Sequence, residues 1–93
     1  MILSFKDKET EKIWNQGVSK KYAIAIQKIA LRKLFMLNRA HLLLDLMVPP
    51  ANKLEKLKGG RAGQYSIRIN DRWRICFYWK DNNAYAVEIA DYH

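Results

Sequence analysis

The sequence is poor in the residues that build disulfides and metal centres. It contains one cysteine and two histidines among 93 residues. A single cysteine excludes an internal disulfide, and three such side chains are too few of the usual ligands for a zinc site built by the protein. We therefore expect neither a metal nor another cofactor. Cys76 lies in the strand-like run Arg74-Ile75-Cys76-Phe77, which favours a small sheet residue over a reactive nucleophile.

Long apolar runs are also missing. No stretch approaches the roughly 20 residues that span a bilayer, and the segment from Met1 to Lys6 lacks the pattern of a signal peptide. We therefore expect a cytoplasmic protein with no membrane partner. The length of 93 residues allows one small domain covering residues 1–93. A hydrophobic fraction of 49%, with 12% aromatic residues, is typical of a chain that folds.

Acidic residues are scarce relative to basic ones. Nine aspartates and glutamates stand against 17 lysines and arginines, which gives a formal net charge of +8 and a pI near 9.8. This balance indicates a polyanionic partner, which could be a nucleic acid, an acidic membrane surface or an acidic protein. Between residues 53 and 74 only Glu55 and Asp71 are acidic. The basic residues of this segment are Lys53, Lys56, Lys58, Arg61, Arg68, Arg72 and Arg74.

The first part of the chain predicts a short strand and a short helix. Ile2–Phe5 has a strand-like composition. Asp7 can cap a helix whose first turn carries Glu9 and Glu11, where negative charge is favourable. Gly17 is a natural stop for this helix.

The segment from Lys20 to about Asn38 has the clearest helical pattern. Its apolar positions recur at spacings of three and four: Ala23, Ile26, Ala30, Leu34 and Leu37. A stripe of basic residues lies elsewhere on the same helix: Lys21, Lys28, Arg32 and Arg39. This stripe is either a nucleic-acid face or an ordinary solvated helix face.

A change of period follows the helical half. Leu42–Leu46 predicts one further helical turn, and the prolines within Met47–Asn52 predict an extended connection. From Leu54 the apolar period is two. The predicted strands are 64–69, 72–79 and 84–90, with turns at Asn70-Asp71 and at residues 80–83. We expect an α+β fold: a small antiparallel sheet of three to four strands, with two to three N-terminal helices on one face.

Strand alternation sorts the predicted sheet residues into two faces. The face toward the helices would carry Tyr65, Ile67, Ile69, Trp73, Ile75, Phe77, Trp79, Tyr85, Val87 and Ile89. The opposite face would carry Ser66, Arg68, Arg72, Arg74, Cys76, Tyr78, Glu88 and Tyr92. Arginines beside tyrosines on a sheet suit RNA, because bases stack on aromatic rings and guanidinium groups pair with phosphates.

The last third of the chain holds candidates for each part of a metal-free ribonuclease. Such an enzyme needs a base for the 2′-hydroxyl proton, cations for the developing phosphorane charge and an acid for the leaving 5′-oxygen. Arg74 and Lys58 could act on the phosphate. The candidate proton donors are Tyr92 and His93, and the candidate acceptors are Glu55 and Asp91.

Each candidate also has a structural alternative. A C-terminal histidine is often part of a frayed chain end. Arg74 could form a cross-strand ion pair with Glu88 that contributes little. The run from Lys58 to Arg61 could be a plain basic loop. From residue chemistry alone the chain is basic and suited to RNA, and the choice among these alternatives stays open.

Several runs together resemble a known family. They are Leu54-Glu55-Lys56-Leu57-Lys58-Gly59, then Arg61, Gly63 to Asn70, Trp73-Arg74-Ile75 and the terminal Asp91-Tyr92-His93. With the opening Met1 to Lys12, they resemble the HigB toxins of the RelE/ParE superfamily, also described as plasmid-maintenance killer proteins. The resemblance covers essentially the whole chain.

This resemblance implies a RelE-like fold and a metal-independent mRNA interferase that cleaves translated message in the ribosomal A site. It implies a helix-turn-helix antitoxin of the HigA type, with operator DNA bound only through the toxin–antitoxin complex. By position, Lys58 and Arg74 would contact the scissile phosphate, and Asp91, Tyr92 and His93 would belong to the active site. Glu55 stands where a characterised type of HigB has a histidine, so a carboxylate would take that place.

Two other functions are compatible with the residues. One is a ParE-like toxin that inhibits gyrase, which would bind a protein and need no nuclease site. The other is a basic RNA-binding module without catalysis. DNA damage signalling with intact transcripts would indicate the first, and ribosome or RNA affinity without cleavage would indicate the second.

Overall fold

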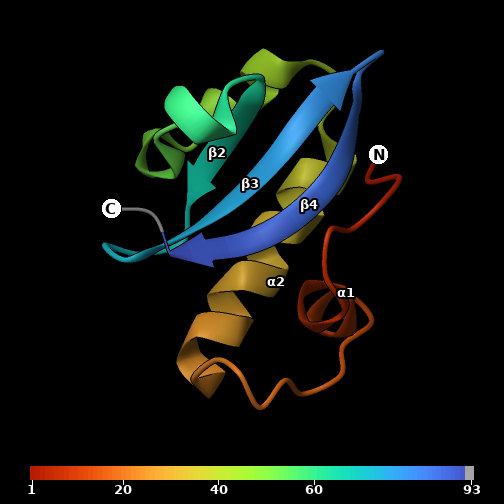
Figure 1. The fold of residues 1–93 in the computed structure, drawn as a ribbon, viewed down its shortest axis with the longest axis vertical. Coiled ribbons are helices and arrows are strands. Elements are labelled where there is room, and N and C mark those ends of the chain that lie inside the picture. Colours follow the sequence, from red (N-terminus) through yellow and green to blue (C-terminus); the bar gives the residue numbers. More distant parts are fainter. Residues whose placement is uncertain (92–93) are drawn as a thin grey trace.

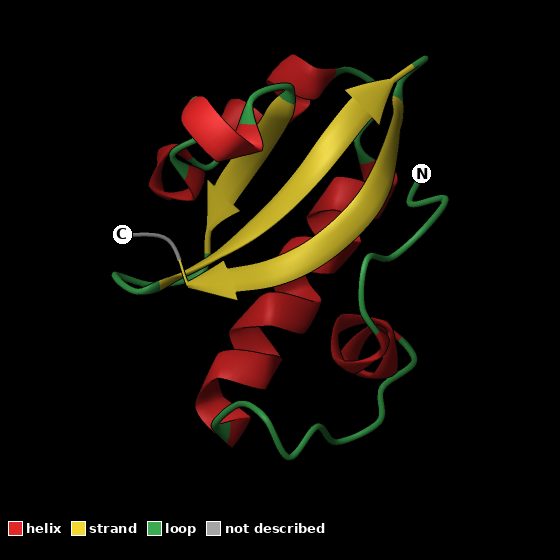
Figure 2. Cartoon of the chain, in the orientation of Figure 1, coloured by secondary structure: helices red, strands yellow, loops and turns green. Residues whose placement is uncertain are grey.

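A computed structural model describes residues 1–91 as a four-stranded sheet backed by helices (Figure 1, Figure 2). The elements, in chain order, are α1 (Lys8–Trp14), α2 (Ile24–Arg39), the 3₁₀ turns η1 (Leu43–Met47) and η2 (Pro50–Asn52), β1 (Glu55–Lys56), the 3₁₀ turn η3 (Gly59–Arg61), β2 (Gln64–Arg68), β3 (Trp73–Lys80) and β4 (Asn83–Asp91). The strands are antiparallel neighbours in the order β1-β2-β3-β4. The predicted α+β fold is therefore confirmed.

The helix α1 begins where the sequence predicts. The side chain of Asp7 accepts a hydrogen bond from the Thr10 N–H at 2.9 Å, and Glu9 and Glu11 lie in the first turn. After Trp14 the left-handed residue is Gln16, with φ of 63°. Gly17 follows because a Cβ there would lie 2.9 Å from the Lys12 side chain. The helix thus ends near the predicted glycine. Glycine is required there because the Lys12 side chain lies too close for a Cβ, not because the backbone has a positive φ.

The helix α2 begins four residues later than the sequence predicts. Gln27 explains the difference, because its amide group holds the preceding segment in a non-helical loop. Its Nε2 donates to the carbonyls of Ser19 and Tyr22 at 2.7 and 2.6 Å, and its Oε1 accepts from the Ser19 N–H at 2.9 Å. A side chain from the first helical turn thus satisfies the backbone of residues 19–22.

The connection after α2 differs from the predicted extended segment. The expected helical turn is present as η1, but Pro50 opens a second short turn, η2, in place of extended chain. Asn52 is buried and joins this segment to α2, because it accepts a hydrogen bond from Lys33 Nζ and donates one to the Leu46 carbonyl at 3.1 Å. The first residue of a helical turn has no hydrogen-bond partner for its N–H within the turn, so proline fits there. The presence of prolines therefore did not exclude a second turn in this connection.

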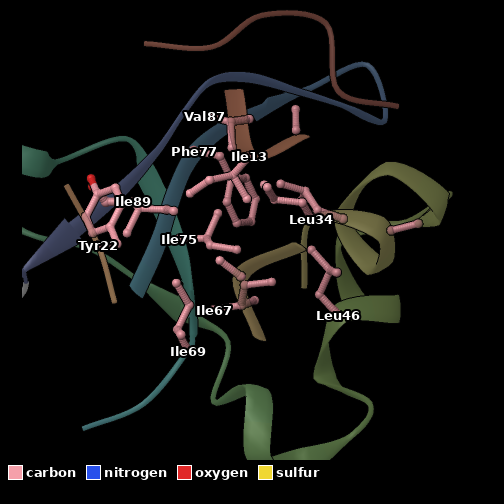
Figure 3. Packing of buried hydrophobic residues seen from close by; sticks show 14 residues of the cluster. Ile13, Tyr22, Leu34, Leu46, Ile67, Ile69, Ile75, Phe77, Val87 and Ile89 are labelled. Carbon is pink, nitrogen blue, oxygen red and sulfur yellow. The ribbon is translucent and has the colours of Figure 1, made fainter. Parts of the chain in front are cut away.

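The main core lies between the sheet and the helices (Figure 3). Ile67, Ile75 and Phe77 from the sheet meet Leu34 and Leu37 of α2, and all five side chains are fully buried. Trp73 and Trp79 pack at the border of this core. The alternation of apolar residues on β2 and β3 therefore predicted the helix-facing side of these strands correctly.

A β-bulge changes the alternation in β4. Cys76 pairs with Glu88, but Tyr78 pairs with Tyr85, so β4 contains one more residue than β3 over this stretch. Ala86 lies in the bulge with φ of 50°. Because the extra residue inverts the pattern, Ala84 faces the core and Tyr85 shares the face of Tyr78. The prediction that Tyr85 meets the helices was wrong for this reason.

The N-terminal segment runs along β4 without forming a full strand. Ile2 and Phe5 make isolated parallel bridges with Ala84 and Val87. The Ser4 Oγ also accepts a hydrogen bond from the Ala86 N–H at 2.8 Å, at the bulge. The predicted strand at residues 2–5 is thus present only as these two bridges. Within the described part of the chain no helix has the length and apolarity that crossing a membrane requires.

Candidate functional site

The face of the sheet away from α2 is less open than the sequence predicts. The segment from β1 to η3 covers part of it, and Leu57 packs there against Cys76 and Ala90 in a small second core. Ser66 and Cys76 are fully buried, and Arg74 is only 9% exposed. Burial raises the pKa of the Cys76 thiol. The expectation that Cys76 is a small sheet residue is confirmed.

Arg74 is held at two points on this face. Its Nε donates to Ser66 Oγ at 2.7 Å, and its Nη2 donates to the Lys53 carbonyl at 2.7 Å. Lys53, whose carbonyl accepts this bond, has a left-handed backbone with φ of 45°. A guanidinium group has five N–H donors in a rigid fork, so these two contacts fix its plane. Arg74 is therefore a pre-oriented cation.

Glu55 and Lys58 are both exposed. Glu55 is opposite Ser66 in the sheet, and Ser66 is opposite Cys76, so these residues form one row across the sheet. Lys58 immediately precedes η3. Lys56, in contrast, is opposite Tyr65, whose ring stacks near Phe77 of the main core. The structure thus brings Glu55 and Arg74 to the same face and places Lys56 on the other face.

Arg61 lies in a polar cluster that the sequence did not reveal. Glu88 Oε2 accepts contacts from Arg61 Nη1 at 3.1 Å and from Lys6 Nζ at 3.2 Å. Burial is the largest single influence and lowers the pKa of Arg61, but the hydrogen bond to Glu88 and the electrostatic interactions with Cys76, Glu88 and Tyr78 together raise it. The partners of Glu88 are thus Arg61 and Lys6, and not Arg74 as considered in the sequence analysis. A loop and the N-terminal segment supply these partners, and no periodicity signals them.

The basic residues at the other end of the sheet are paired with acids. Arg68 forms an ion pair with Asp71, and Arg72 Nε donates to Asp91 Oδ2 at 2.9 Å. The guanidinium of Arg72 also stacks over the ring of Trp73 at 4.7 Å. Lys53 is exposed and contacts Arg74 only through its carbonyl.

Asp91 lies at the end of β4 beside the β2–β3 turn (Figure 1). It is opposite Trp73, while its neighbour Ala90 is opposite Arg74. Strand alternation therefore places the Asp91 side chain on the side of Trp73, not on the face of Arg74. Tyr92 and His93, the other two predicted terminal site residues, lie outside the described residues.

The described residues supply cations and a carboxylate, not a metal cluster. Within residues 1–91 no group of three or more histidine, cysteine, aspartate or glutamate side chains is arranged to hold a metal ion. A fixed guanidinium and an exposed carboxylate on one face, with an exposed lysine shortly after β1, suit a phosphodiester, because the cations can stabilise negative charge that develops on its oxygens.

Comparison with known proteins identifies a family whose model matches most of the chain. The model of the HigB-like toxins, described as RelE-like toxins of type II toxin–antitoxin system HigB, matches residues 3–93. Toxin HigB-1 of Vibrio cholerae serotype O1 is 37% identical over 87 residues, which cover 90% of each chain. Endoribonuclease HigB of Proteus vulgaris is 44% identical over 41 residues, which cover 44% of this chain and 45% of that protein.

A solved structure has the same fold. It is the YoeB–YefM complex from Staphylococcus aureus, one chain of which aligns with a TM-score of 0.60 at 23% identity. The alignment covers 100% of this chain and 98% of that chain. The arrangement of two helices against an antiparallel sheet is therefore shared across a wide sequence distance.

Proposed function

The chain belongs to the HigB-like family of toxins of type II toxin–antitoxin systems, and on this premise we propose that it is an endoribonuclease that cleaves messenger RNA on the ribosome. The observation that carries the proposal is the buried guanidinium of Arg74, fixed by Ser66 and Lys53 on the face that also bears Glu55. A fixed cation costs no reorganisation when charge develops on a phosphate.

The proposed reaction is attack by the 2′-hydroxyl on the adjacent phosphorus. A base takes the hydroxyl proton as the 2′-oxygen–phosphorus bond forms, and the phosphorus–5′-oxygen bond breaks as an acid protonates the leaving oxygen. The products are a 2′,3′-cyclic phosphate and a 5′-hydroxyl. Arg74 and Lys58 stabilise the phosphorane. Glu55 shares the face of Arg74 and is a base candidate there, and Tyr92 and His93 are the remaining proton-transfer candidates, while Asp91, on the side of Trp73, has the role of orienting them.

The basic surface has a role in substrate binding. Lys53, Lys56, Arg61, Arg68 and Arg72 provide positive charge around the site, although Arg61, Arg68 and Arg72 are each paired with a carboxylate. These pairs weaken the attraction for phosphate. The ribosome can supply the missing affinity and orientation by presenting the message to a small toxin.

A toxin of a type II system has a protein antitoxin as its partner. We propose that this antitoxin is of the helix-turn-helix HigA type, and that operator DNA is bound only through the toxin–antitoxin complex. The site of action is the cytoplasm, where the 70S ribosome and message are found.

The test is cleavage of a defined message in a reconstituted translation complex, with the product ends mapped. We expect cuts within the codon of the A site that leave a 2′,3′-cyclic phosphate. Lys58→Ala should reduce the rate by about 10- to 100-fold, whereas Lys20→Ala, which removes an exposed lysine of the loop before α2, should cleave normally.

Intact message with the wild-type chain would contradict the proposal. DNA damage signalling in cells with intact transcripts would then indicate a gyrase-directed toxin. Ribosome binding without cleavage would indicate an RNA-binding module.

A further inference from the structure

An open hollow lies on the sheet at the end of β3 and β4 that is remote from Asp91. Its volume is about 590 Å³. This is within the usual range for small-molecule sites, and a nucleobase is smaller than such ligands. None of its residues belongs to the catalytic set proposed above. The lining residues are Gly63, Tyr78, Trp79, Lys80, Asp81 and Tyr85.

Two tyrosines from neighbouring strands line this hollow. Tyr78 and Tyr85 are register partners on β3 and β4, and the bulge at Ala86 is what brings Tyr85 to this face. Without the extra residue in β4, strand alternation would direct Tyr85 into the helical side. The bulge therefore places Tyr85 beside Tyr78, on a face to which the sequence did not assign it.

The ring of Tyr78 is exposed and yet fixed in position. The side chain of this residue is among the exposed large apolar groups, at 43%. Gln64 Nε2 donates to its hydroxyl at 3.4 Å, and a Cβ on Gly63 would lie 3.5 Å from its Cε1, so the Gly63 backbone packs against the ring edge. A ring that is already held loses little side-chain entropy when a ligand stacks on it.

The hollow carries charges of both signs. Lys80 lines it, and Arg61 is linked to it through Gln64, whose Oε1 accepts from Arg61 Nη1 at 3.2 Å. Two carboxylates are near: Glu88 is paired with Lys6 and Arg61, and Asp81 lines the hollow next to Lys80. Aromatic rings beside cations are the combination that binds unpaired bases in single-stranded RNA.

We propose that Tyr78 and Tyr85 form a stacking subsite for an unpaired base of the RNA substrate, a few nucleotides from the scissile phosphate. The proposal rests on the endoribonuclease function. Arg74 and Tyr78 are four residues apart on the same face of β3, which separates them by about 13 Å. A strand whose scissile phosphate lies at Arg74 and which passes over Leu57, the cover of Cys76, thus brings a flanking base to the hollow.

The test compares two short oligonucleotides that share a backbone. Both are 2′-O-methylated, which prevents cleavage by blocking the attacking hydroxyl, and one is abasic at every position. Their binding to the full chain, separated from its antitoxin, is measured by fluorescence anisotropy. The wild type should prefer the oligonucleotide with bases. Tyr78→Ala should weaken that binding by roughly 5- to 150-fold and leave abasic binding unchanged, while Tyr78→Phe should retain the preference.

Phe35→Ala is the matched control. Phe35 is an equally exposed ring at 48%, but it lies on α2 against Trp14. Its loss should not alter base preference. Equal weakening of both oligonucleotides by Tyr78→Ala would overturn the proposal, as would a wild type without base preference. Unchanged RNA binding with weaker antitoxin binding would also overturn it and would assign the hollow to a protein partner.

The two proposals fail in different ways. Message cleavage by the wild type in the translation complex, combined with no base preference, would overturn the subsite alone. Base preference that depends on Tyr78, without cleavage of message, would support the subsite and overturn the endoribonuclease function.

Discussion

At the residue scale, the basic side chains of the last third differ in what surrounds them. Arg74 is buried and bonded to neutral oxygens, so its charge is not cancelled by a carboxylate in these contacts. Arg61, Arg68 and Arg72 are each paired with an acid. Composition counts these four residues alike, but contacts separate one fixed cation from three neutralised ones.

Arg74 therefore has a structural role and a proposed catalytic role. Two substitutions distinguish these roles. Arg74→Ala should lower the free energy of unfolding by about 2–4 kcal/mol, because buried acceptors on Ser66 and Lys53 lose their donors. Arg74→Lys keeps the charge but cannot make both contacts in one plane, so cleavage should fall at least about tenfold. Chemical denaturation and the translation-complex assay measure the two effects. An Arg74→Lys protein that cleaves normally would contradict the requirement for a fixed guanidinium.

The raised pKa of the Cys76 thiol predicts that the free energy of unfolding falls at alkaline pH. Burial raises the pKa of its thiol above the ordinary value, and nearby Arg61 opposes this only in part. The unfolded chain loses this proton near pH 8.5, at about the ordinary value, while the folded chain keeps it. The contribution to stability is therefore complete below about pH 8.5. It falls as the pH rises toward the folded pKa, by at most about 1.4 kcal/mol per pH unit.

The measurement is the free energy of unfolding between about pH 8 and 9, where tyrosines remain mostly protonated. Cys76→Ala should show a shallower decline than the wild type, whatever its stability at neutral pH. Two parallel curves would contradict the assignment of the decline to this thiol.

At the element scale, β4 and the turn before it determine which side chains share a face. The β3–β4 turn has two left-handed residues, Asp81 and Asn82, with φ of 52° and 62°. This is the geometry of a tight two-residue hairpin with a type I′ turn. The turn and the bulge at Ala86 together position Tyr85 beside Tyr78.

Substitutions of Asn82 test the assignment of the β3–β4 turn as type I′. Asn82→Ala should lower the free energy of unfolding by about 1 kcal/mol, since alanine tolerates a left-handed backbone less well than asparagine. Asn82→Gly should be neutral or slightly stabilising. Asn15→Ala, at an asparagine with φ of −81°, is the control and should change stability by less than about 0.5 kcal/mol. Thermal or chemical denaturation distinguishes these outcomes, and equal stability of the two Asn82 variants would contradict the turn assignment.

At the scale of the whole molecule, the net charge of +8 acts through its distribution. The helices cover one face of the sheet (Figure 1), and the segment from Lys53 to η3, which contains the edge strand β1, carries exposed Lys53 and Lys58. Charge on that segment is close to the proposed phosphate position, whereas charge on the α1 side is not.

RNA binding should consequently weaken with salt in proportion to the phosphates contacted. For single strands the slope of log K against log salt is about −0.7 per contact. Lys58→Ala should make the slope shallower by about 0.7, and Lys20→Ala should not change it. Titrations of a short RNA over a range of salt concentrations measure both. A slope unaffected by Lys58→Ala would remove this residue from the phosphate-binding set.

Much of the fold could be predicted from the sequence because its signals are local. The cap at Asp7, the apolar spacing in α2 and the alternation along β2 and β3 depend on neighbours a few residues away. The roles proposed for the site residues come from the resemblance to the HigB toxins, and they remain predictions that the variants above test.

The sequence by itself determined the fold class, the basic charge and the helix-facing residues of the central strands, since each follows from periodicity and composition. Only the tertiary structure decided that Tyr85 turns to the face of Tyr78, that Glu88 pairs with Lys6 and Arg61, and that Arg74 is buried. The physical reason is that each of these features depends on contacts between residues far apart in the sequence. They are the pairing of β4 with β3, the partners of Glu88 and the segment that covers Arg74.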